Sequence, residues 1–418
     1  MMAINPKYQI HTAENRRFLE EMRKELFSFG HGFPSPGGST YYLGDDGTPM
    51  KEKNRETYAT ARMAHVYSLG VFLDYPGSRQ LAAEAIRGLT QELQDPVNGG
   101  WYAGLTADNA IVPNKLCYAH AFVILAASSG VLADIPGAAQ LLEDALKVYD
   151  QHFWDEKEGL SCDTWNTEFT ILDPYRGLNA NMHTVEAFLA ASDVTGDERY
   201  RTRSGRIIRR VLGWASANQW RIPEHYSDTW EPQPECNKDR PDDAFKPYGA
   251  TPGHGIEWAR LILQWALSSF HNNQDAAPYI EASENLFLTA VSDAWNVDGA
   301  PGICYTTDWD GKPVVHDRMH WTLAEGINTS AALYHVTGKQ RYADQYYTFM
   351  EYLDDKVLDH KHGSWFHQLD RFNRPMTSVW PGKPDLYHAL QATLIPLYQA
   401  DLSILPAVAR GAVYSPKG

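Results

Sequence analysis

The sequence predicts an all-α protein, an (α/α)6 barrel of six helical hairpins. Three observations lead to this fold class. Amphipathic helical patterns fill most of the 418 residues, short extended segments interrupt them at intervals of about sixty residues, and glycine stop signals separate consecutive helices. Because one helical hairpin cannot bury its apolar face alone, six in succession can close into a ring with one helix of each pair inside.

The extended segments predict short β-hairpins or extended loops. Their starts lie about sixty residues apart, except for one interval of about eighty residues that contains 231–249. That insertion has four prolines among polar residues, so we expect a surface loop without a core of its own and a single domain over 1–418. The six segments are 41–47, 101–104, 161–165, 221–226, 303–309 and 365–370.

The helical patterns predict twelve helices, and Gly196 and Gly338 supply left-handed caps where two of them stop. The helix after each extended segment is expected to be the inner one, with its N-terminus at the end of the barrel where the hairpins lie. The predicted helices are 16–29, 57–73, 79–93, 118–130, 138–153, 182–194, 201–218, 254–270, 279–295, 322–336, 341–358 and 386–400.

Composition excludes several classes of protein. The formal net charge is -15 and no run of Lys or Arg resembles a patch for nucleic acid or an anionic membrane. No stretch reaches the roughly 20 apolar residues of a membrane span, and residues 1–24 lack a secretory signal, so we expect a cytoplasmic protein. The four cysteines have no C-x-x-C spacing and are expected to be reduced: Cys117, Cys162, Cys236 and Cys304.

One short pattern occurs three times near the start of a predicted inner helix. A histidine is followed three residues later by Glu or Gln, which lies on the same helix face and can orient the ring. Three such histidines on separate inner helices suggest one converged site at the hairpin end. The pairs are His183 with Glu186, His254 with Glu257 and His388 with Gln391.

Other side chains on the inner helices complete a candidate sugar site. Flat faces of Tyr118 and Trp321 suit a pyranose ring, whereas His, Arg, Glu and Asn suit its hydroxyls. Two opposed histidines and Arg62 suit proton abstraction beside a carbonyl without a metal. Alternatives remain open: Arg62 in a structural ion pair, Asn179 as a helix cap, and Glu257 and Glu325 as partners in a structural network. Trp101, Trp365 and Trp380 are expected to pack in the core.

Several longer motifs resemble the N-acylglucosamine 2-epimerase superfamily, and within it the branch of D-mannose isomerases and sulfoquinovose isomerases. The motifs are 59–67, 99–102, 179–183, 251–258 and 383–388, in the same order along nearly the whole chain. The resemblance implies that His254 and His388 form the acid/base pair. It also implies that Arg62, His183 and Glu257 support the sugar, with Tyr118, Asn179, Trp321 and Glu325 lining the pocket.

The implied reaction is a metal-independent interconversion of D-mannose and D-fructose, with D-lyxose and D-xylulose as a further pair, through a cis-enediol. We assign C2 proton abstraction to His388 and ring opening to His254, although the motif leaves the roles exchangeable. Sulfoquinovose isomerases carry a sulfonate-associated Gln where this chain has Pro384, which cannot donate that bond. Lys246 stands where that relative has Arg, whereas Gln368 is shared, so mannose is favoured.

Competing functions remain at this stage. They are a 2-epimerase of the N-acylglucosamine or cellobiose type, a sulfoquinovose isomerase, a non-catalytic binding protein, and a glycoside hydrolase using Glu257 and Glu325. His254 and Glu257 could ligate a divalent ion, but no H-E-x-x-H motif is present, so no metal or cofactor is expected. The expected partner is a monosaccharide, bound by a monomer or homodimer.

Overall fold

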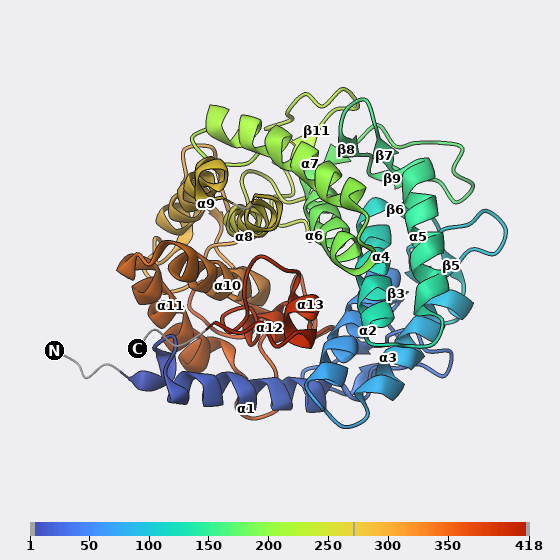
Figure 1. Ribbon diagram of the computed structural model, residues 1–418, viewed down its shortest axis with the longest axis horizontal. Coiled ribbons are helices and arrows are strands. Elements are labelled where there is room, and N and C mark those ends of the chain that lie inside the picture. Colours follow the sequence, from blue (N-terminus) through green and yellow to red (C-terminus); the bar gives the residue numbers. More distant parts are fainter. Residues whose placement is uncertain (1–4, 271, 415–418) are drawn as a thin grey trace.

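A computed structural model describes residues 5–270 and 272–414 (Figure 1). Over that part the chain is mostly helical, with the helix pairs and short hairpins that the sequence predicts. A 3-10 turn, η1 (Pro6–Tyr8), precedes the first helix, and π-helical turns η2 (Gly88–Glu92) and η3 (Leu353–Val357) extend α3 and α11. The α-helices are α1 (Ala13–Gly30), α2 (Thr57–Phe72), α3 (Ser78–Arg87), α4 (Cys117–Leu132), α5 (Ala138–His152), α6 (Leu178–Thr195), α7 (Glu198–Ala217), α8 (Pro252–Ser269), α9 (Asn273–Ala294), α10 (His320–Thr337), α11 (Gln340–Tyr352), α12 (Tyr387–Ala392) and α13 (Ile404–Ala409).

The last predicted helix is the one that differs most. The pattern predicts a helix over 386–400, but α12 ends at Ala392 and a further short helix, α13, follows. Pro396 explains the early end, because it has no N–H to donate and its ring would clash with the carbonyl of Ala392 in a continuing helix. The chain after α12 therefore turns back, and α13 lies inside the ring, against α2, α4 and α6 (Figure 1).

The even-numbered helices form the inner ring. Each of α2, α4, α6, α8, α10 and α12 contacts the next, and α12 also contacts α2. Every residue of α2 from Thr57 to Gly70 is buried, whereas outer helix α5 buries one stripe, Ala138, Leu141, Leu142, Ala145 and Tyr149. That stripe follows the helical period, so the outer helices need only one apolar face.

Short strands tie the N-terminal ends of the inner helices together. The segment before each inner helix hydrogen-bonds the hairpin of the next repeat: β3 with β4, β6 with β9, β10 with β11, Ala250 with Thr307, and β14 with β15. Lys383 N donates to Leu43 O at 2.9 Å. This bond completes a closed ring of strand and loop pairings, which we call the hairpin belt. The strands are β1 (Tyr42–Leu43), β2 (Pro49–Met50), β3 (Arg55–Glu56), β4 (Gly104–Leu105), β5 (Ile111–Val112), β6 (Lys115–Leu116), β7 (Trp154–Asp155), β8 (Leu160–Ser161), β9 (Thr164–Trp165), β10 (Arg176–Gly177), β11 (His225–Tyr226), β12 (Thr306–Thr307), β13 (Pro313–Val315), β14 (Arg318–Met319) and β15 (Gln368–Leu369).

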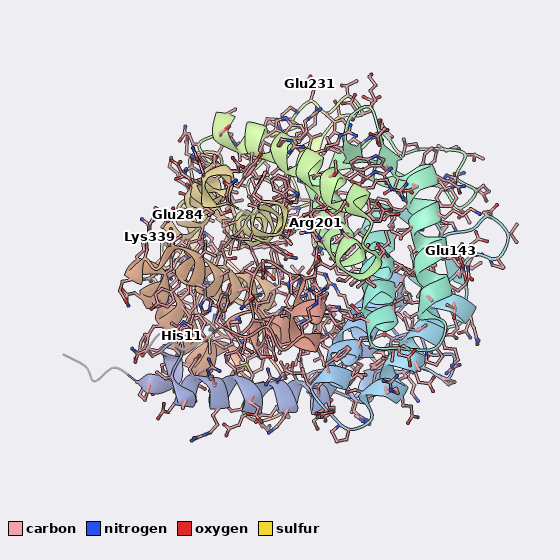
Figure 2. The ribbon with its side chains drawn as sticks, in the orientation of Figure 1. His11, Glu143, Arg201, Glu231, Glu284 and Lys339 are labelled. Carbon is pink, nitrogen blue, oxygen red and sulfur yellow. The ribbon has the colours of Figure 1, made fainter. Side chains whose placement is uncertain are left out.

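An ion pair joins α9 to the start of α11 on the outside of the ring. Glu284 of α9 and Lys339, just before α11, lie side by side at the outer rim (Figure 2), and Lys339 Nζ donates to Glu284 Oε1 at 2.6 Å. The four cysteines are free thiols, as expected. Among the helices that the structure describes, none combines the length and apolar character needed to cross a bilayer.

Candidate active site

A cavity with about 570 Å³ of empty space, its open mouth included, lies at the N-terminal end of the inner helices, and all six of them contribute to its wall. Eight of the nine candidate residues line it: Arg62, Tyr118, Asn179, His183, His254, Glu257, Trp321 and His388. Glu325 does not line it; this carboxylate lies behind His388. The structure therefore brings the three motif histidines to one site.

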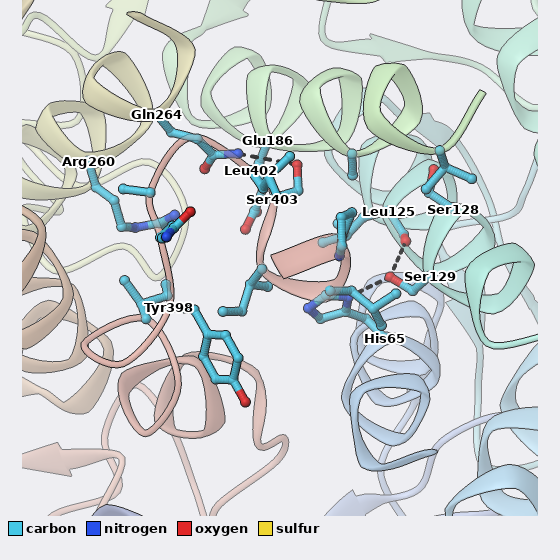
Figure 3. Close-up of a pocket in the computed structure, with 18 of the residues that line it drawn as sticks. His65, Leu125, Ser128, Ser129, Glu186, Arg260, Gln264, Tyr398, Leu402 and Ser403 are labelled. Atoms are coloured by element: carbon cyan, nitrogen blue, oxygen red, sulfur yellow. Dashed lines mark hydrogen bonds between the residues drawn. The ribbon is translucent and has the colours of Figure 1, made fainter. Parts of the chain in front are cut away.

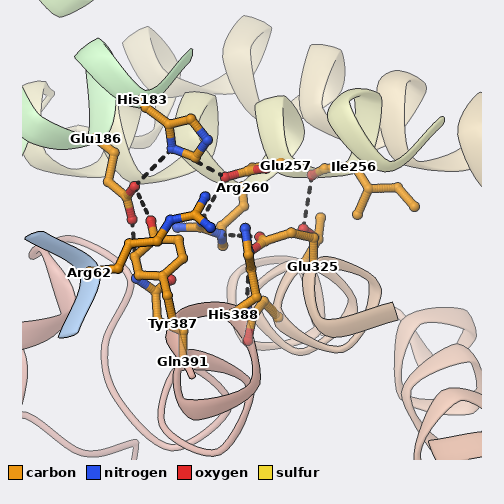
Figure 4. Close-up of polar contacts among 12 residues, drawn as sticks. Arg62, His183, Glu186, Ile256, Glu257, Arg260, Glu325, Tyr387, His388 and Gln391 are labelled. Carbon is orange, nitrogen blue, oxygen red and sulfur yellow. Dashed lines mark hydrogen bonds and ion pairs between the residues drawn. The ribbon is translucent and has the colours of Figure 1, made fainter. Parts of the chain in front are cut away.

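His388 is held from behind by a carboxylate of α10. Its Nδ1 lies 3.1 Å from Glu325 Oε1, and Arg260 Nε donates to Glu325 Oε2 at 2.7 Å (Figure 4). This arrangement leaves Nε2 for the cavity. Burial lowers the pKa of His388 well below its usual range, and the nearby Arg62 lowers it further. At neutral pH the ring is therefore a neutral imidazole with an available lone pair.

His254 has a partner that the sequence pattern does not indicate. Its Nδ1 lies 3.0 Å from Glu224 Oε1, whereas the predicted partner Glu257 lies 3.7 Å from Arg260. Glu224 precedes β11, in the 221–226 segment, and its backbone carbonyl accepts from Leu178 N at 3.1 Å. The indole of Trp321 lies against the His254 ring, with the two ring centres 5.0 Å apart. The prediction that Glu257 orients His254 is wrong.

His183 does use the residue three positions on. Its Nδ1 lies 3.4 Å from Glu186 Oε2, and Tyr387 donates to the same oxygen. Gln391, predicted to orient His388, instead donates from Nε2 to Glu186 Oε1 at 3.2 Å. The prediction for Gln391 is therefore wrong. In a ring of facing helices, a buried polar group pairs with the nearest complementary group across the ring, which need not be on its own helix.

Three carboxylates surround Arg260 beneath the cavity (Figure 4). Burial and the neighbouring Glu325 raise the pKa of Glu257 well above its usual range. Burial also opposes the charge on Glu186, but the His183 bond and Arg260 hold its pKa below its usual range, so Glu186 is ionised. Donor atoms of Glu257, Glu325 and His388 come within 4.8 Å of one another, as metal ligands do. Arg260 already supplies the positive charge for this cluster.

Arg62 combines the two roles left open by the sequence. It lines the cavity, and it is also in a buried ion pair, because Nη1 donates to Asp385 Oδ2 at 3.0 Å. Its Nη2 donates to Tyr118 Oη at 2.7 Å. Burial opposes the charge on Arg62, but Tyr118 and Asp385 outweigh it, so its pKa is raised and the guanidinium stays charged.

The cavity also contains residues that sequence reasoning missed. His320 and His367 stack with ring centres 3.6 Å apart, and burial lowers the pKa of each. Only their positions in the sequence could have indicated that they belong to the site, because His320 adjoins Trp321 and His367 lies in the sixth extended segment. Asp385 lies in the 383–388 motif. The remaining wall residues not predicted for this site are Ala244, Phe245, Tyr305, Trp380 and Pro384.

The structure also tests three further predictions, which concern Asn179, three of the tryptophans and the insertion 231–249. Asn179 does not cap α6, because Gly177 is the N-cap residue, and the Asn179 Oδ1 atom has no partner within the protein. Trp101 and Trp365 are fully buried as expected, and Trp380 is partly buried, packing against the cluster of Tyr305, Val315 and Met319 while also lining the cavity. The insertion 231–249 is more than a surface loop, since Phe245 contacts Tyr118 and covers part of the site.

Comparisons with known proteins agree with this geometry. The sequence profile of the N-acylglucosamine 2-epimerase (GlcNAc 2-epimerase) family matches residues 37–392. A D-mannose isomerase of Pseudomonas cannabina pv. alisalensis is 41% identical over 88% of this chain and 89% of the relative. One from Thermobifida fusca is 38% identical over 95% of this chain and 98% of the relative.

Solved structures resemble the whole ring. A crystal structure of a D-mannose isomerase superposes with a TM-score of 0.84 at 28% identity, over 91% of this chain and 97% of that one. The cellobiose 2-epimerase of Spirochaeta thermophila DSM 6192 shares the fold, with a TM-score of 0.77 at 18% identity, over 95% of this chain and 98% of that one. With the profile match spanning most of the sequence, the chain belongs to the N-acylglucosamine 2-epimerase family.

Proposed function

We propose that this protein is an aldose–ketose isomerase that interconverts D-mannose and D-fructose, in a single (α/α)6-barrel domain over 1–418. Near full-length similarity to two D-mannose isomerases supports the reaction. The observation that carries it is the neutral His388 imidazole, held by Glu325 with Nε2 available at the cavity. Such a group is a general base at neutral pH.

The proposed reaction begins when His254 assists opening of the sugar ring. His388 Nε2 then takes the proton from C2, and the C–H electron pair forms the C1=C2 bond of an enediol while O1 becomes a hydroxyl. Protonated His388 returns the proton to C1 on the same face, as O2 loses its proton and becomes the ketose carbonyl. His254 moves the hydroxyl protons between O2 and O1, so atoms and charge balance.

The charged Arg62 stabilises the intermediate in this scheme. Negative charge develops on O1 and O2 as C2 loses its proton, and a fixed guanidinium in a buried site stabilises it without reorganising. Because Asp385 and Tyr118 hold Arg62 in place, its position is set before the substrate binds. His183, oriented by Glu186, is positioned to accept or donate a hydrogen bond to a sugar hydroxyl.

Wall chemistry favours an uncharged sugar. Arg62 is the one cationic Lys or Arg among the described residues that line the cavity, and Asp385 already pairs with it. Pro384 lines the wall, whereas Lys246 lies over the Tyr175 ring, 3.7 Å from its centre. These positions favour a hexose over a sulfonated sugar.

The carboxylates do not suit an inverting glycosidase. Oxygens of Glu257 and Glu325 lie within 4.8 Å of each other, in one cluster with His388. An inverting hydrolase needs carboxyl groups about 6.5–9.5 Å apart on either side of the scissile bond. Glu325 also bonds Arg260 and His388, which leaves it no access to a leaving group.

The test is incubation with D-mannose, D-lyxose, N-acetylglucosamine and cellobiose in D₂O, followed by NMR of products and of deuterium at C1 and C2. We expect D-fructose from D-mannose, with deuterium entering only at the carbons that His388 serves. His388→Asn should remove conversion while leaving the fold intact by circular dichroism. Epimerised N-acetylglucosamine or cellobiose with untouched mannose would refute the proposal.

Metal removal gives an independent check. Because Arg260 supplies the positive charge in the carboxylate cluster, conversion of mannose should survive exhaustive dialysis against EDTA. The measurement is the initial rate of ketose formation before and after dialysis, with metal content determined by mass spectrometry. A rate that falls with the metal content and returns on adding a divalent ion would contradict this expectation.

A further inference from the structure

A second cavity lies at the other end of the ring, with about 630 Å³ of empty space including its open mouth, and none of its wall residues lines the catalytic cavity. We call it the distal cavity. Its walls come from the C-terminal halves of α4, α6, α8 and α10, from the middle of α2, and from the 395–406 segment that turns back after α12 (Figure 3). Pro396 therefore creates this space, because a continuous α12 would carry that segment elsewhere.

His65 presents a hydrogen-bond acceptor to the distal cavity. Ser129 Oγ donates to Leu125 O at 2.8 Å, so it accepts from His65 Nδ1, which lies 2.7 Å away. That assignment leaves Nε2 with a lone pair, and Nε2 is buried without a partner within the protein. Burial lowers the pKa of His65 to about 4, so the ring is neutral at pH 7. In Figure 3 the ring points towards the cavity.

One further polar atom of the wall lacks a partner. Ser128 Oγ has no hydrogen-bond partner within the protein, whereas Arg260 pairs through Nη2 with Glu257 Oε1 at 3.7 Å and through Nε with Glu325. Figure 3 places Arg260 across the cavity from His65. A hydroxyl group in the cavity can donate to His65 Nε2. Unpartnered buried polar atoms are costly, so a ligand that pairs them gains affinity.

The other wall residues determine which chemical groups the rest of the ligand can have. The 395–406 segment contributes mainly apolar side chains: Ile395, Leu402, Ile404, Leu405 and Pro406. An anion is disfavoured because the charge of Arg260 is already balanced by Glu325 and by Glu186, the carboxylate in the same wall. The site therefore suits an uncharged molecule with a hydroxyl end and an apolar end.

We propose that the distal cavity binds a small uncharged amphipathic alcohol. Its hydroxyl donates to His65 Nε2, and its alkyl part lies against Leu402 and its neighbours. Because the two cavities share no wall residue, this ligand binds together with the sugar and does not compete with it.

The test uses hexane-1,2-diol as the probe and saturation-transfer-difference NMR on the full chain. We expect a saturable signal that persists at saturating D-mannose. Leu402→Trp, which fills the cavity from the 395–406 segment, should weaken binding about tenfold or more, equivalent to about 1.4 kcal/mol. Leu288→Trp adds the same indole on outer helix α9 and should leave binding unchanged. Circular dichroism and mannose conversion confirm that each variant is folded.

Several outcomes would overturn the proposal. They are no saturable signal, equal binding to the wild type and Leu402→Trp, or displacement of the diol by D-mannose, which would locate it in the catalytic cavity. A crystal soaked in the diol that shows only water in the distal cavity would do the same. If Leu402→Trp fails to fold, Ala190→Leu narrows the cavity from α6 and takes its place.

Discussion

At the scale of single residues, carboxylates decide which nitrogen each active-site histidine presents. Glu224, Glu186 and Glu325 each lie within 3.4 Å of a histidine Nδ1, and each leaves Nε2 for the cavity. Only one of these partners shares a helix with its histidine. An oriented, neutral imidazole is what proton transfer to and from carbon requires, so these contacts matter to the chemistry more than the spacing along the helix.

The variant Glu224→Gln tests whether the contact with a carboxylate matters to the chemistry of His254. The amide keeps the size of the side chain but removes the charge that lies 3.0 Å from His254 Nδ1 and stabilises the ring when it carries a proton. We expect kcat for mannose to fall about 10- to 100-fold with KM little changed. Glu231→Gln, at an exposed position of the insertion, is the matched control and should have no effect. An effect confined to KM would mean that Glu224 only shapes the wall.

The pH profile tests the neutral state of the rings. Burial lowers the pKa of His183 to about 4 and that of His388 well below 6.5, so both stay unprotonated until the pH falls below 6.5. The acid limb of kcat/KM should therefore lie well below pH 6.5. The measurement is kcat/KM from pH 4 to 8, with circular dichroism at each pH to separate unfolding from titration. A midpoint near 6.5 would contradict the buried neutral state.

At the scale of elements, basic residues fasten the hairpin belt to the inner helices. Lys115, just before α4, donates to Asp95 Oδ2 at 2.8 Å and to Gly99 O at 2.9 Å. Lys383, before α12, makes the same pair of bonds, at 2.7 Å each, to Asp359 and Gly363 O. These two repeats thus share an ion pair as well as a helix pattern, each just before an inner helix.

The variant Lys115→Met measures how much the ion pair between Lys115 and Asp95 contributes to the stability of the protein. The variant leaves Asp95 buried without its cation, which typically costs about 3–5 kcal/mol. We expect the free energy of unfolding, measured in urea, to fall by that order, while mannose conversion at low temperature persists. Lys147→Met, on the exposed face of α5, is the control. Equal stability of the two variants would show that the buried pair adds nothing.

At the scale of the whole molecule, the ring depends on contacts between distant parts of the sequence. α12 contacts α2, and Lys383 N bonds Leu43 O, so the last repeat completes the first. One contiguous apolar cluster extends from Ile10 to Val408. No repeat can therefore leave the ring without exposing the faces of its neighbours.

We accordingly expect the chain to unfold as one unit. Tryptophan fluorescence and far-UV circular dichroism should give coincident urea transitions, because all repeats share the same core. The measurement is both signals on the same samples across the transition. Two separated transitions would contradict the proposed single domain over 1–418.

By itself, the sequence determined the helix pairs, the hairpin repeat, which helices are inner, and half of the residues in the cavity wall. These features depend on local periodicity and on motifs that a single chain displays directly. Asn179 and Trp321, for instance, were found because they adjoin the predicted inner-helix starts.

Only the tertiary structure decided the partners of His254 and His388, the place of Trp380, the end of α12 and the distal cavity. Glu224 and Glu325 are 30 and 63 residues from the histidines that they hold, so no helical spacing indicates them. Buried polar groups pair with whatever complementary atom the closed ring brings nearest, and that choice exists only once the ring has closed.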